Sequence, residues 1–176
     1  MAKTAQSKAK HAATRASAKP RASQAGHPGD AIALLEADHR EVEGYFEKYE
    51  SLKSDAEKKA LAGKICLALK VHTQIEEEIF YPAARKATHD DDLLDEATVE
   101  HAGAKTLIAE IEAMKPGQPL YDAKVKVLGE QVEHHVKEEE EELFPEVREK
   151  KLDLKALGAE MAARKEELMR QLAPKN

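Results

Sequence analysis

One pattern of histidine, glutamate and proline occurs twice in this chain at nearly the same spacing. His72 and His135 are each followed by a glutamate four residues later and by a proline ten residues later. A further histidine precedes each pattern, His39 by 33 residues and His101 by 34. A repeat of this length indicates two similar pieces of structure that pack on each other. We therefore expect two similar hairpins, each carrying two histidines and one glutamate.

The sequence around these residues has the periodicity of helices. Apolar residues recur at three- and four-residue steps, which is typical of helices with one buried face. The predicted helices span residues 30–52, 55–86, 91–114, 120–149 and 153–172. Asp30 is expected to cap the first helix, and Ser54 or Asp55 the second. Pro82 and Pro145 lie near the ends of the second and fourth helices, where each is expected to kink its helix or end it early.

Four long helices joined by short links pack as antiparallel neighbours. The predicted fold is all-α: an antiparallel up-down-up-down four-helix bundle over 30–149, with a disordered N-terminal tail over 1–29 and an extra C-terminal amphipathic helix over 150–176, docked outside the bundle. The predicted inward residues are Leu35, His39, Val42, Phe46 and Tyr49; Leu61, Ile65, Ala68 or Leu69, His72, Ile75 or Glu76, Ile79 and Ala83; Leu94, Ala97, His101, Ala104, Ile108 and Ile111; Val125, Leu128, Val132, His135, Glu139, Leu143 and Phe144; and, on the last helix, Leu154, Leu157, Met161, Leu168 and Leu172.

The charge distribution separates the tail from the rest of the chain. Residues 1–29 contain six basic residues, no acid and few large apolar side chains, so a disordered tail is expected. A polyanion-binding arm, an organelle transit peptide and a solubilising tail remain open for it. The rest of the chain is acidic, so no specific nucleic acid partner is expected.

The sequence favours a cytoplasmic protein. No stretch approaches the roughly 20 apolar residues that a membrane span needs. No apolar region near the N-terminus resembles a secretory signal. The single cysteine, Cys66, cannot form an internal disulfide and lies in an apolar run, so we predict a buried structural thiol in a reducing compartment. The oligomeric state is left open.

The repeated pattern predicts a metal site. Helix residues four apart lie on one face, ~5–6 Å apart at Cβ, so each repeat offers an imidazole and a carboxylate to one place. Such donors suit iron, and also manganese or zinc. Without a metal, burying two carboxylates among imidazoles costs several kcal/mol. The predicted metal ligands are His39, His72, Glu76, His101, His135 and Glu139.

Several neighbouring residues compete for roles at this site. His134, with Glu138 four residues on, is a rival to His135, but adjacent helix residues point about 100° apart and only one can face inward. The proline register and the neighbouring apolar residues favour His135. Glu43, four residues after His39, is a candidate acceptor behind the ligands. The tyrosines that could approach the site, with core packing as the alternative, are Tyr45, Tyr49 and Tyr81. The histidines assigned no role are His11, His27 and His89.

At these residues the chain resembles the hemerythrin HHE cation-binding family. The resemblance covers about residues 30–149 and rests on EADHREVEGYF, HTQIEEEIFYP, EHAGAK and HHVKEEEEELFP. It implies an antiparallel four-helix bundle around an oxo- or hydroxo-bridged di-iron centre. The implied histidine ligands are His39, His72, His101 and His135, and the implied bridging carboxylates are Glu76 and Glu139.

The chain differs from the oxygen-carrying members in two places. Their fifth histidine, one turn after the third-helix histidine, corresponds to Lys105 here. Their aspartate, five residues after the fourth-helix histidine, corresponds to Glu140, while Glu139 stands at four. The resulting set is more similar to the bacterial di-iron proteins linked to nitrosative stress and iron–sulfur repair, although their short cysteine-containing domain has no counterpart.

Three classes of function follow from the resemblance. The leading hypothesis is a non-haem di-iron protein that binds or senses a small ligand such as O2, NO or H2O2, in oxidative or nitrosative stress or in iron homeostasis. A second is a di-iron enzyme with peroxidase-like, catalase-like or oxidase activity. A third is a non-catalytic iron storage or donor protein. No acid–base group is clearly dedicated to catalysis, so a metal-binding protein is favoured over a dedicated enzyme.

Overall fold

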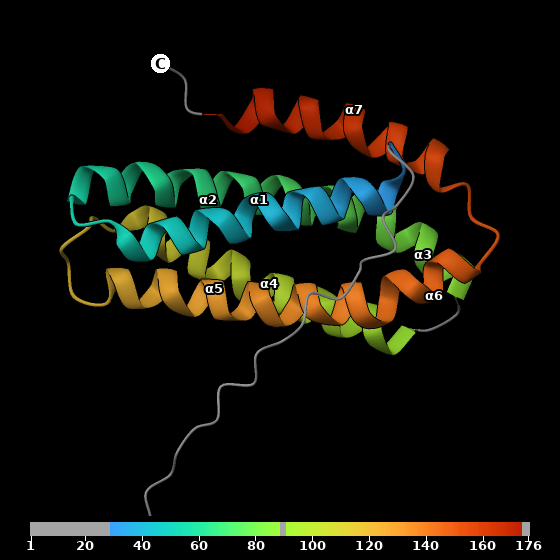
Figure 1. Ribbon diagram of the computed structural model, residues 1–176, viewed down its shortest axis with the longest axis horizontal. Coiled ribbons are helices and arrows are strands. Elements are labelled where there is room, and N and C mark those ends of the chain that lie inside the picture. The colour runs from blue at the N-terminus through green and yellow to red at the C-terminus, as the bar shows by residue number, and fades with distance from the viewer. Residues whose placement is uncertain (1–28, 89–90, 174–176) are drawn as a thin grey trace, which may run out of the picture.

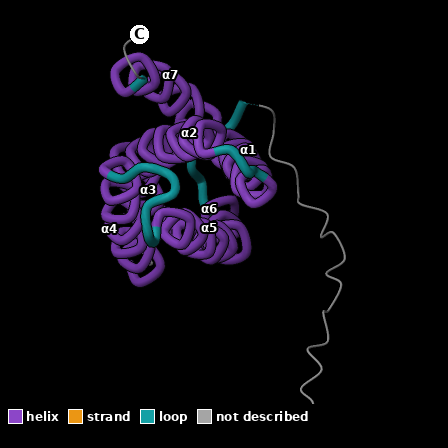
Figure 2. Tube along the Cα trace, turned by 90° about the vertical axis from the view of Figure 1, so that its left-hand side faces the viewer, coloured by secondary structure: helices purple, strands orange, loops and turns teal. Residues whose placement is uncertain are grey.

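The computed structural model describes residues 29–88 and 91–173, and this part of the chain is helical throughout, with short connections. Four long runs of helix, which we call rods, form a bundle in which neighbouring rods are antiparallel. A fifth helix lies outside them (Figures 1 and 2). The first rod is α1 (Ala31–Ser51); the second is α2 (Asp55–Ile75), η1 (Glu76–Phe80) and α3 (Tyr81–Thr88); the third is α4 (Asp91–Ala113); the fourth is α5 (Tyr121–Glu138), η2 (Glu139–Leu143) and α6 (Phe144–Glu149); and the outer helix is α7 (Leu154–Leu172). The predicted all-α bundle is confirmed. The predicted tail, except Gly29, and His11, His27 and His89 lie outside the described residues.

The helix starts follow from capping chemistry. The side chain of Asp30 accepts a hydrogen bond of 2.8 Å from the backbone N–H of Ala33, as predicted. Asp153 does the same for α7 by accepting from the N–H of Ala156 at 2.9 Å. Ser54 stands at the cap position of α2 without a side-chain cap hydrogen bond. These caps satisfy N–H groups that the first helical turn leaves without partners.

Two five-residue π turns, η1 and η2, interrupt the second and fourth rods, and each begins at the glutamate that ends the His-x-x-x-Glu motif. The N–H groups of Tyr81 and Phe144 donate to the carbonyls of Glu76 and Glu139, five residues back. A proline follows each turn, and its ring and missing N–H disfavour regular α-helical hydrogen bonding to the carbonyl four residues earlier. Neither proline ends its rod, so the expected early termination does not occur.

The π turn shifts the buried face of the second rod by one residue. Ile79 and Ala83 are only partly buried, whereas their neighbours Phe80 and Ala84 are fully buried. The predicted register past Glu76 was therefore wrong, because an evenly wound helix was assumed and a π turn holds one extra residue. In α4, which has no such turn, all the predicted inward residues are buried.

Apolar clusters fill the bundle on both sides of its middle. One cluster includes Leu35, Phe80 and Phe144 and reaches α7. The other includes Ile65 and Leu128 and contains the free thiol of Cys66. Burial raises the pKa of that thiol to about 11, which confirms the predicted buried cysteine and makes it a poor nucleophile at neutral pH. The polar site lies between these two clusters.

The outer helix α7 packs across α1 and α2 (Figure 2); the sequence predicted a helix docked outside the bundle but not which rods it covers. Met161 and Leu168 are buried there, while Leu172, predicted to face inward, is exposed. Gly158 lies so close to the start of α1 that a Cβ atom would be 2.6 Å from the backbone carbon of Asp30. In the described part of the chain, we find no helix with the length and apolar character needed to cross a membrane.

Candidate metal centre

Six buried polar side chains meet in the middle of the bundle, and each rod supplies at least one. We call them the inner donors: His39 from α1, His72 from α2, Glu76 from η1, His101 from α4, His135 from α5 and Glu139 from η2. They are the six residues singled out in the sequence, and the structure brings all six together. Their role as metal ligands stays a prediction.

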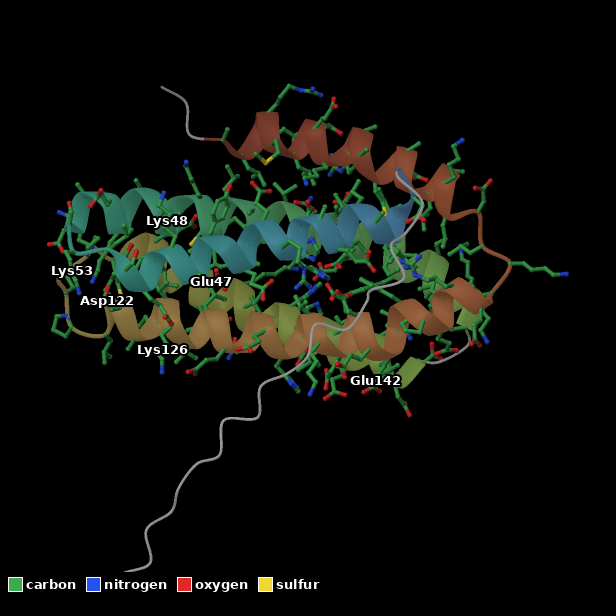
Figure 3. The ribbon with its side chains drawn as sticks, in the orientation of Figure 1. Glu47, Lys48, Lys53, Asp122, Lys126 and Glu142 are labelled. Atoms are coloured by element: carbon green, nitrogen blue, oxygen red, sulfur yellow. The ribbon has the colours of Figure 1, made fainter. Side chains whose placement is uncertain are left out.

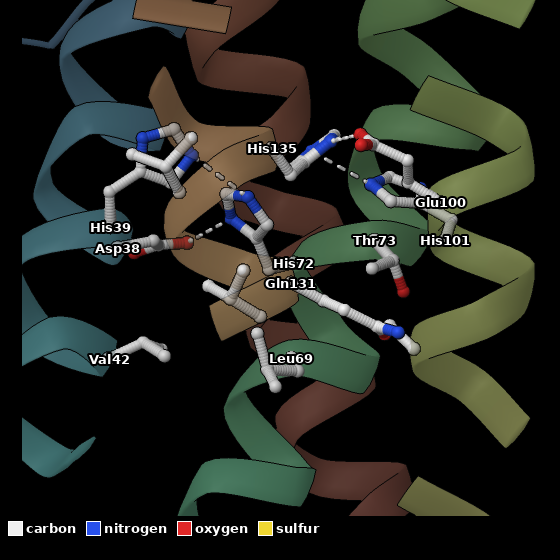
Figure 4. A pocket seen from close by; sticks show the side chains of 13 residues that line it. Asp38, His39, Val42, Leu69, His72, Thr73, Glu100, His101, Gln131 and His135 are labelled. Atoms are coloured by element: carbon white, nitrogen blue, oxygen red, sulfur yellow. Dashed lines mark hydrogen bonds and ion pairs between the residues drawn. The ribbon is translucent and has the colours of Figure 1, made fainter. Parts of the chain in front are cut away.

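The four imidazoles form two pairs (Figure 4). His39 Nε2 lies 3.1 Å from His72 Nε2, and His101 Nε2 lies 3.2 Å from His135 Nε2. Histidine–zinc bonds are about 2.0–2.1 Å long, so two imidazoles bound at a right angle to one ion would have nitrogens about 2.9 Å apart. The spacing within each pair therefore suits two ligands of one metal ion.

Both carboxylates contact both pairs. Glu76 Oε1 lies 3.2 Å from His72 Nε2, and its Oε2 lies 3.4 Å from His101 Nε2. Glu139 Oε2 lies 3.3 Å from His39 Nε2 and 3.6 Å from His135 Nε2. Each glutamate thus stands where it can be shared between two ions, one per histidine pair.

The hydrogen bonding of these carboxylates is incomplete. Both oxygens of Glu76 and the Oε2 atom of Glu139 are buried and accept no hydrogen bond in the protein. A buried carboxylate without such partners is unfavourable by several kcal/mol unless a cation compensates it. Two groups of these residues each bring one nitrogen or oxygen per residue within 4.8 Å of the others in the group. The groups are His39–His72–Glu76–Glu139 and Glu76–His101–His135. The donor set therefore fits a pair of metal ions.

The electrostatics of the metal-free centre favour positive charge among the carboxylates. Burial would lower the pKa of His72, but Glu76 and Asp38 outweigh burial and raise it to about 10. Burial would raise the pKa of Glu139, but His135 and His39 hold it well below its usual value. Burial lowers the pKa of His101. Protons on imidazoles balance the carboxylates here, and a metal ion would replace those protons.

Each inner histidine turns its outer nitrogen, Nδ1, toward a carboxylate. We call the four acidic residues that supply these groups the outer carboxylates: Asp38, Glu77, Glu100 and Glu140. The Nδ1-to-oxygen distances are 2.9 Å from His39 to Glu140, 3.5 Å from His72 to Asp38, 3.0 Å from His101 to Glu77, and 2.8 Å from His135 to Glu100. A carboxylate only accepts, so in the hydrogen-bonded pairs Nδ1 carries a proton, and Nε2 is the ring nitrogen that faces the centre. This arrangement orients imidazole ligands in metal sites generally.

Tyr81 is the one tyrosine of the three considered that reaches the centre. Its hydroxyl donates to Glu139 Oε1 at 2.9 Å and lies 3.4 Å from His101 Nε2. Burial raises the pKa of Tyr81 well above its ordinary value, so the hydroxyl keeps its proton. Tyr45 and Tyr49 instead donate to Glu41 and Asp122, away from the inner donors.

One role predicted from the sequence belongs to a different residue, and four residues behind the inner histidines were not predicted. Glu43 does not approach His39; it is 57% exposed and pairs with Arg40, while Glu140 from η2 takes the expected place. The outer carboxylates were not identified, although each adjoins an inner donor. Asp38 and Glu100 precede His39 and His101, while Glu77 and Glu140 follow Glu76 and Glu139. The sequence feature that could have identified them is an acidic residue directly before or after an inner donor, which recurs in all four rods.

A small apolar cavity and a larger groove adjoin the centre. The cavity, of about 30 Å³, is lined mainly by carbon atoms of residues that include Val42, Leu69 and Ala104. The groove, of about 810 Å³, runs between α1 and α5 and reaches His39. Figure 3 labels charged residues that line it, Glu47, Asp122 and Lys126. The residues that line both spaces are His39, Val132 and Val136.

The chain is similar to a known domain family and to individual known proteins. The family model of the hemerythrin HHE cation-binding domain matches residues 30–147. A crystal structure of a hemerythrin HHE cation-binding domain-containing protein from Mycobacterium kansasii is 27% identical, with a TM-score of 0.69 over 81% of this chain and 88% of that one. A protein named as a DNA nickase from Nostoc sp. is 29% identical over 65% of this chain, which spans about a third (32%) of that relative's length.

Proposed function

The chain belongs to the hemerythrin HHE cation-binding domain family, and from that premise we propose that its inner donors bind two iron ions, which together take up one small molecule such as O2, NO or H2O2. The observation that carries the proposal is the state of Glu76 and Glu139. Both are buried between two imidazole pairs, and three of their four oxygens accept no hydrogen bond. Two cations, one in each pair, would compensate both charges at once.

The proposed assignment follows the pairing of the imidazoles. His39 and His72 would hold one ion, His101 and His135 the other, and both glutamates would be shared. Mixed imidazole and carboxylate donors suit iron, with manganese or zinc as alternatives. Iron would supply a redox-active centre with affinity for diatomic ligands and peroxide.

The protein's own residues would select the ligand by size and polarity. The cavity beside the imidazoles has room for about one small molecule, and its walls are mostly apolar. Such a space suits a small neutral ligand better than an anion. The outer carboxylates would hold the imidazoles in orientation, and Tyr81 would orient Glu139 by its hydrogen bond to Oε1.

Metal content tests the proposal directly. Protein expressed with ample iron is expected to contain two irons per chain and to show the visible absorption of a di-iron centre. His72→Ala and Glu139→Ala are expected to lose most of that iron, because each removes an inner donor. Glu43→Ala, on the same bundle but exposed, serves as the control. Less than about one metal per chain in the wild-type protein would contradict the proposal.

Ligand titration separates the functional alternatives. A ligand-binding protein would change its spectrum on titration with O2, NO or H2O2 without consuming the ligand rapidly. A di-iron enzyme would instead evolve O2 from peroxide or consume O2 in turnover, and His72→Ala would abolish this. A storage or donor protein would release iron to a chelator readily.

We also propose a reducing compartment such as the cytoplasm, because the one cysteine is free and buried.

A further inference from the structure

Three of the four outer carboxylates form an ion pair with a residue that is always positively charged. Asp38 pairs with Lys165 of α7, and Glu140 pairs with Arg40. Glu77 pairs with Lys105 at 2.6 Å. From three directions, therefore, a cation approaching the inner histidines meets a lysine or arginine next to the carboxylate.

The fourth outer carboxylate, Glu100, has a different partner. His134 Nε2 lies 3.5 Å from Glu100 Oε1 and 3.2 Å from Glu138 Oε1. The other oxygen of Glu100 accepts from His135 Nδ1 at 2.8 Å. Among the described residues, no lysine or arginine forms an ion pair or a hydrogen bond with Glu100 or Glu138. Unlike lysine or arginine, histidine carries no permanent charge near neutral pH.

We call Glu100, His134 and Glu138 the surface cluster. Its ligand-type atoms lie within 4.8 Å of one another, as in the inner groups. The side chain of His134 is 59% exposed, against 22% for Glu100 and 28% for Glu138, so the cluster is open to solvent. One imidazole nitrogen with two carboxylates is a donor set that suits a divalent transition-metal ion.

The two halves of the bundle explain why this cluster exists on one side only. The positions on α2 and at its end that correspond to His134 and Glu138 are Val71 and Ile75. Both are buried, in the apolar cluster that continues into α7. The outer helix packs on α1, α2 and η1 and leaves the opposite side of the bundle uncovered (Figure 2). The α1–α2 side therefore has buried apolar residues at the positions where the α4–α5 side has His134 and Glu138.

We propose that the surface cluster binds a third divalent metal ion and that ions pass from it to the inner donors. Glu100 connects the two sites, because one of its oxygens faces His134 and the other contacts His135. Electrostatics favours this route, because two carboxylates attract a cation here while the other three outer carboxylates are already paired with permanent cations. The loading role rests on the proposed function of the inner donors; the surface site itself does not.

Metal stoichiometry tests the surface site. Metal-free, full-length protein is titrated with Mn2+ and followed by electron paramagnetic resonance of the free ion. We expect three bound ions in the wild-type protein and two in His134→Lys, which places a permanent cation where the other outer carboxylates have one. Glu130→Gln is the matched control, since Glu130 is an exposed acid on the same helix paired with Lys126; it should keep three.

Each result of this titration has one meaning. Two ions in both the wild-type protein and His134→Lys would overturn the surface site and leave the inner centre standing. One ion in the wild-type protein and none in His134→Lys would support the surface site and contradict the proposed inner centre. Circular dichroism of every variant checks that the exposed substitution leaves the helices intact.

The loading role is tested by the rate of filling. Co2+ uptake by metal-free protein is followed by stopped-flow visible absorption at low ionic strength. The slow signal of the inner donors is expected to appear about tenfold more slowly in His134→Lys, with the same final amplitude. Glu138→Gln should slow it as well, and Glu130→Gln should not. Equal rates in all four proteins would overturn the loading route, even if the third ion binds.

Discussion

At the residue scale, the carboxylate that contacts the outer nitrogen of each imidazole is the feature that would most directly set the metal affinity of the site. Glu140 contacts the outer nitrogen of His39 at 2.9 Å and fixes which ring nitrogen points inward. We expect Glu140→Ala to weaken metal binding by about 10- to 100-fold, the usual effect of losing such a partner. Competition with a coloured chelator measures this affinity. Glu43→Ala should leave it unchanged; an equal loss in both variants would contradict the assigned contact.

The hydroxyl of Tyr81 is expected to stabilise the metal-free protein. It donates to Glu139 Oε1, and Tyr81→Phe would leave that buried oxygen without a donor. The expected loss in free energy of unfolding is about 1–3 kcal/mol. Urea unfolding of the metal-free protein measures it. Tyr45→Phe, which removes a hydrogen bond to the exposed Glu41, should lower the free energy of unfolding much less. Similar losses in the two variants would contradict a larger stabilisation by the buried hydrogen bond.

At the residue scale, the sequence predicted the inner set but not the groups behind it. The inner donors stand on helical faces whose spacing can be read within one helix. Glu43 was proposed behind His39 by the same spacing rule, yet the acceptor, Glu140, comes from another rod. A contact between rods depends on how they pack and rotate, which periodicity within one helix does not determine.

At the scale of elements, the π turns were the unpredicted feature. Periodicity analysis assumes even winding, and a five-residue turn changes the register with no compositional mark except the proline that follows. The consequence is visible in the second rod, where Phe80 is buried in place of Ile79. The turns begin at Glu76 and Glu139 themselves, so the wider backbone coincides with the two shared carboxylates. Such turns are frequent at functional sites.

The close approach of α7 to α1 depends on Gly158. A Cβ atom there would lie 2.6 to 2.8 Å from backbone atoms of Gly29, Asp30 and Ala31. Gly158→Ala is expected to lower the free energy of unfolding by about 1–3 kcal/mol and to speed hydrogen exchange in α7. Gly63→Ala is the control, because a Cβ there meets no atom within 4 Å and should stabilise its helix. Unchanged exchange in Gly158→Ala would contradict the close contact.

The attachment of α7 should also weaken in acid. Arg164 of α7 donates from Nε to Glu78 Oε2 at 2.7 Å, and this contact lowers the pKa of Glu78. A carboxylate with a lowered folded pKa contributes stability above its unfolded pKa and loses it as pH falls through the folded value. We therefore expect the Arg164 Nε–H signal in NMR spectra to shift below about pH 4. The same signal in Glu78→Gln should not titrate; a parallel shift there would contradict the assignment.

At the scale of the whole molecule, the bundle could be predicted because its evidence is local. Each rod has its own periodic apolar face, and α4 matches that prediction at every inward position. The position of α7 across α1 and α2 was predicted only as docking outside the bundle, since any exposed pair of rods would satisfy its apolar stripe. The structure shows why the choice matters: α7 supplies Lys165 to Asp38, behind His72, and leaves the α4–α5 side open.

Folding and metal binding should be coupled across the whole chain. An ion that binds only the folded protein stabilises it by about 2.7 kcal/mol at 100 times its dissociation constant. Glu76→Gln removes a buried charge that accepts no hydrogen bond, and it also removes the attraction between that charge and His72. Because these effects oppose each other, the metal-free variant should unfold within about 4 °C of the metal-free wild type. Thermal unfolding followed by circular dichroism measures both proteins with and without Zn2+. The increase in unfolding temperature on adding metal should be large in the wild type and mostly lost in Glu76→Gln, whereas the exposed Glu142→Gln should retain it. An equal increase in all three proteins would mean that the stabilising ions bind somewhere other than the inner donors.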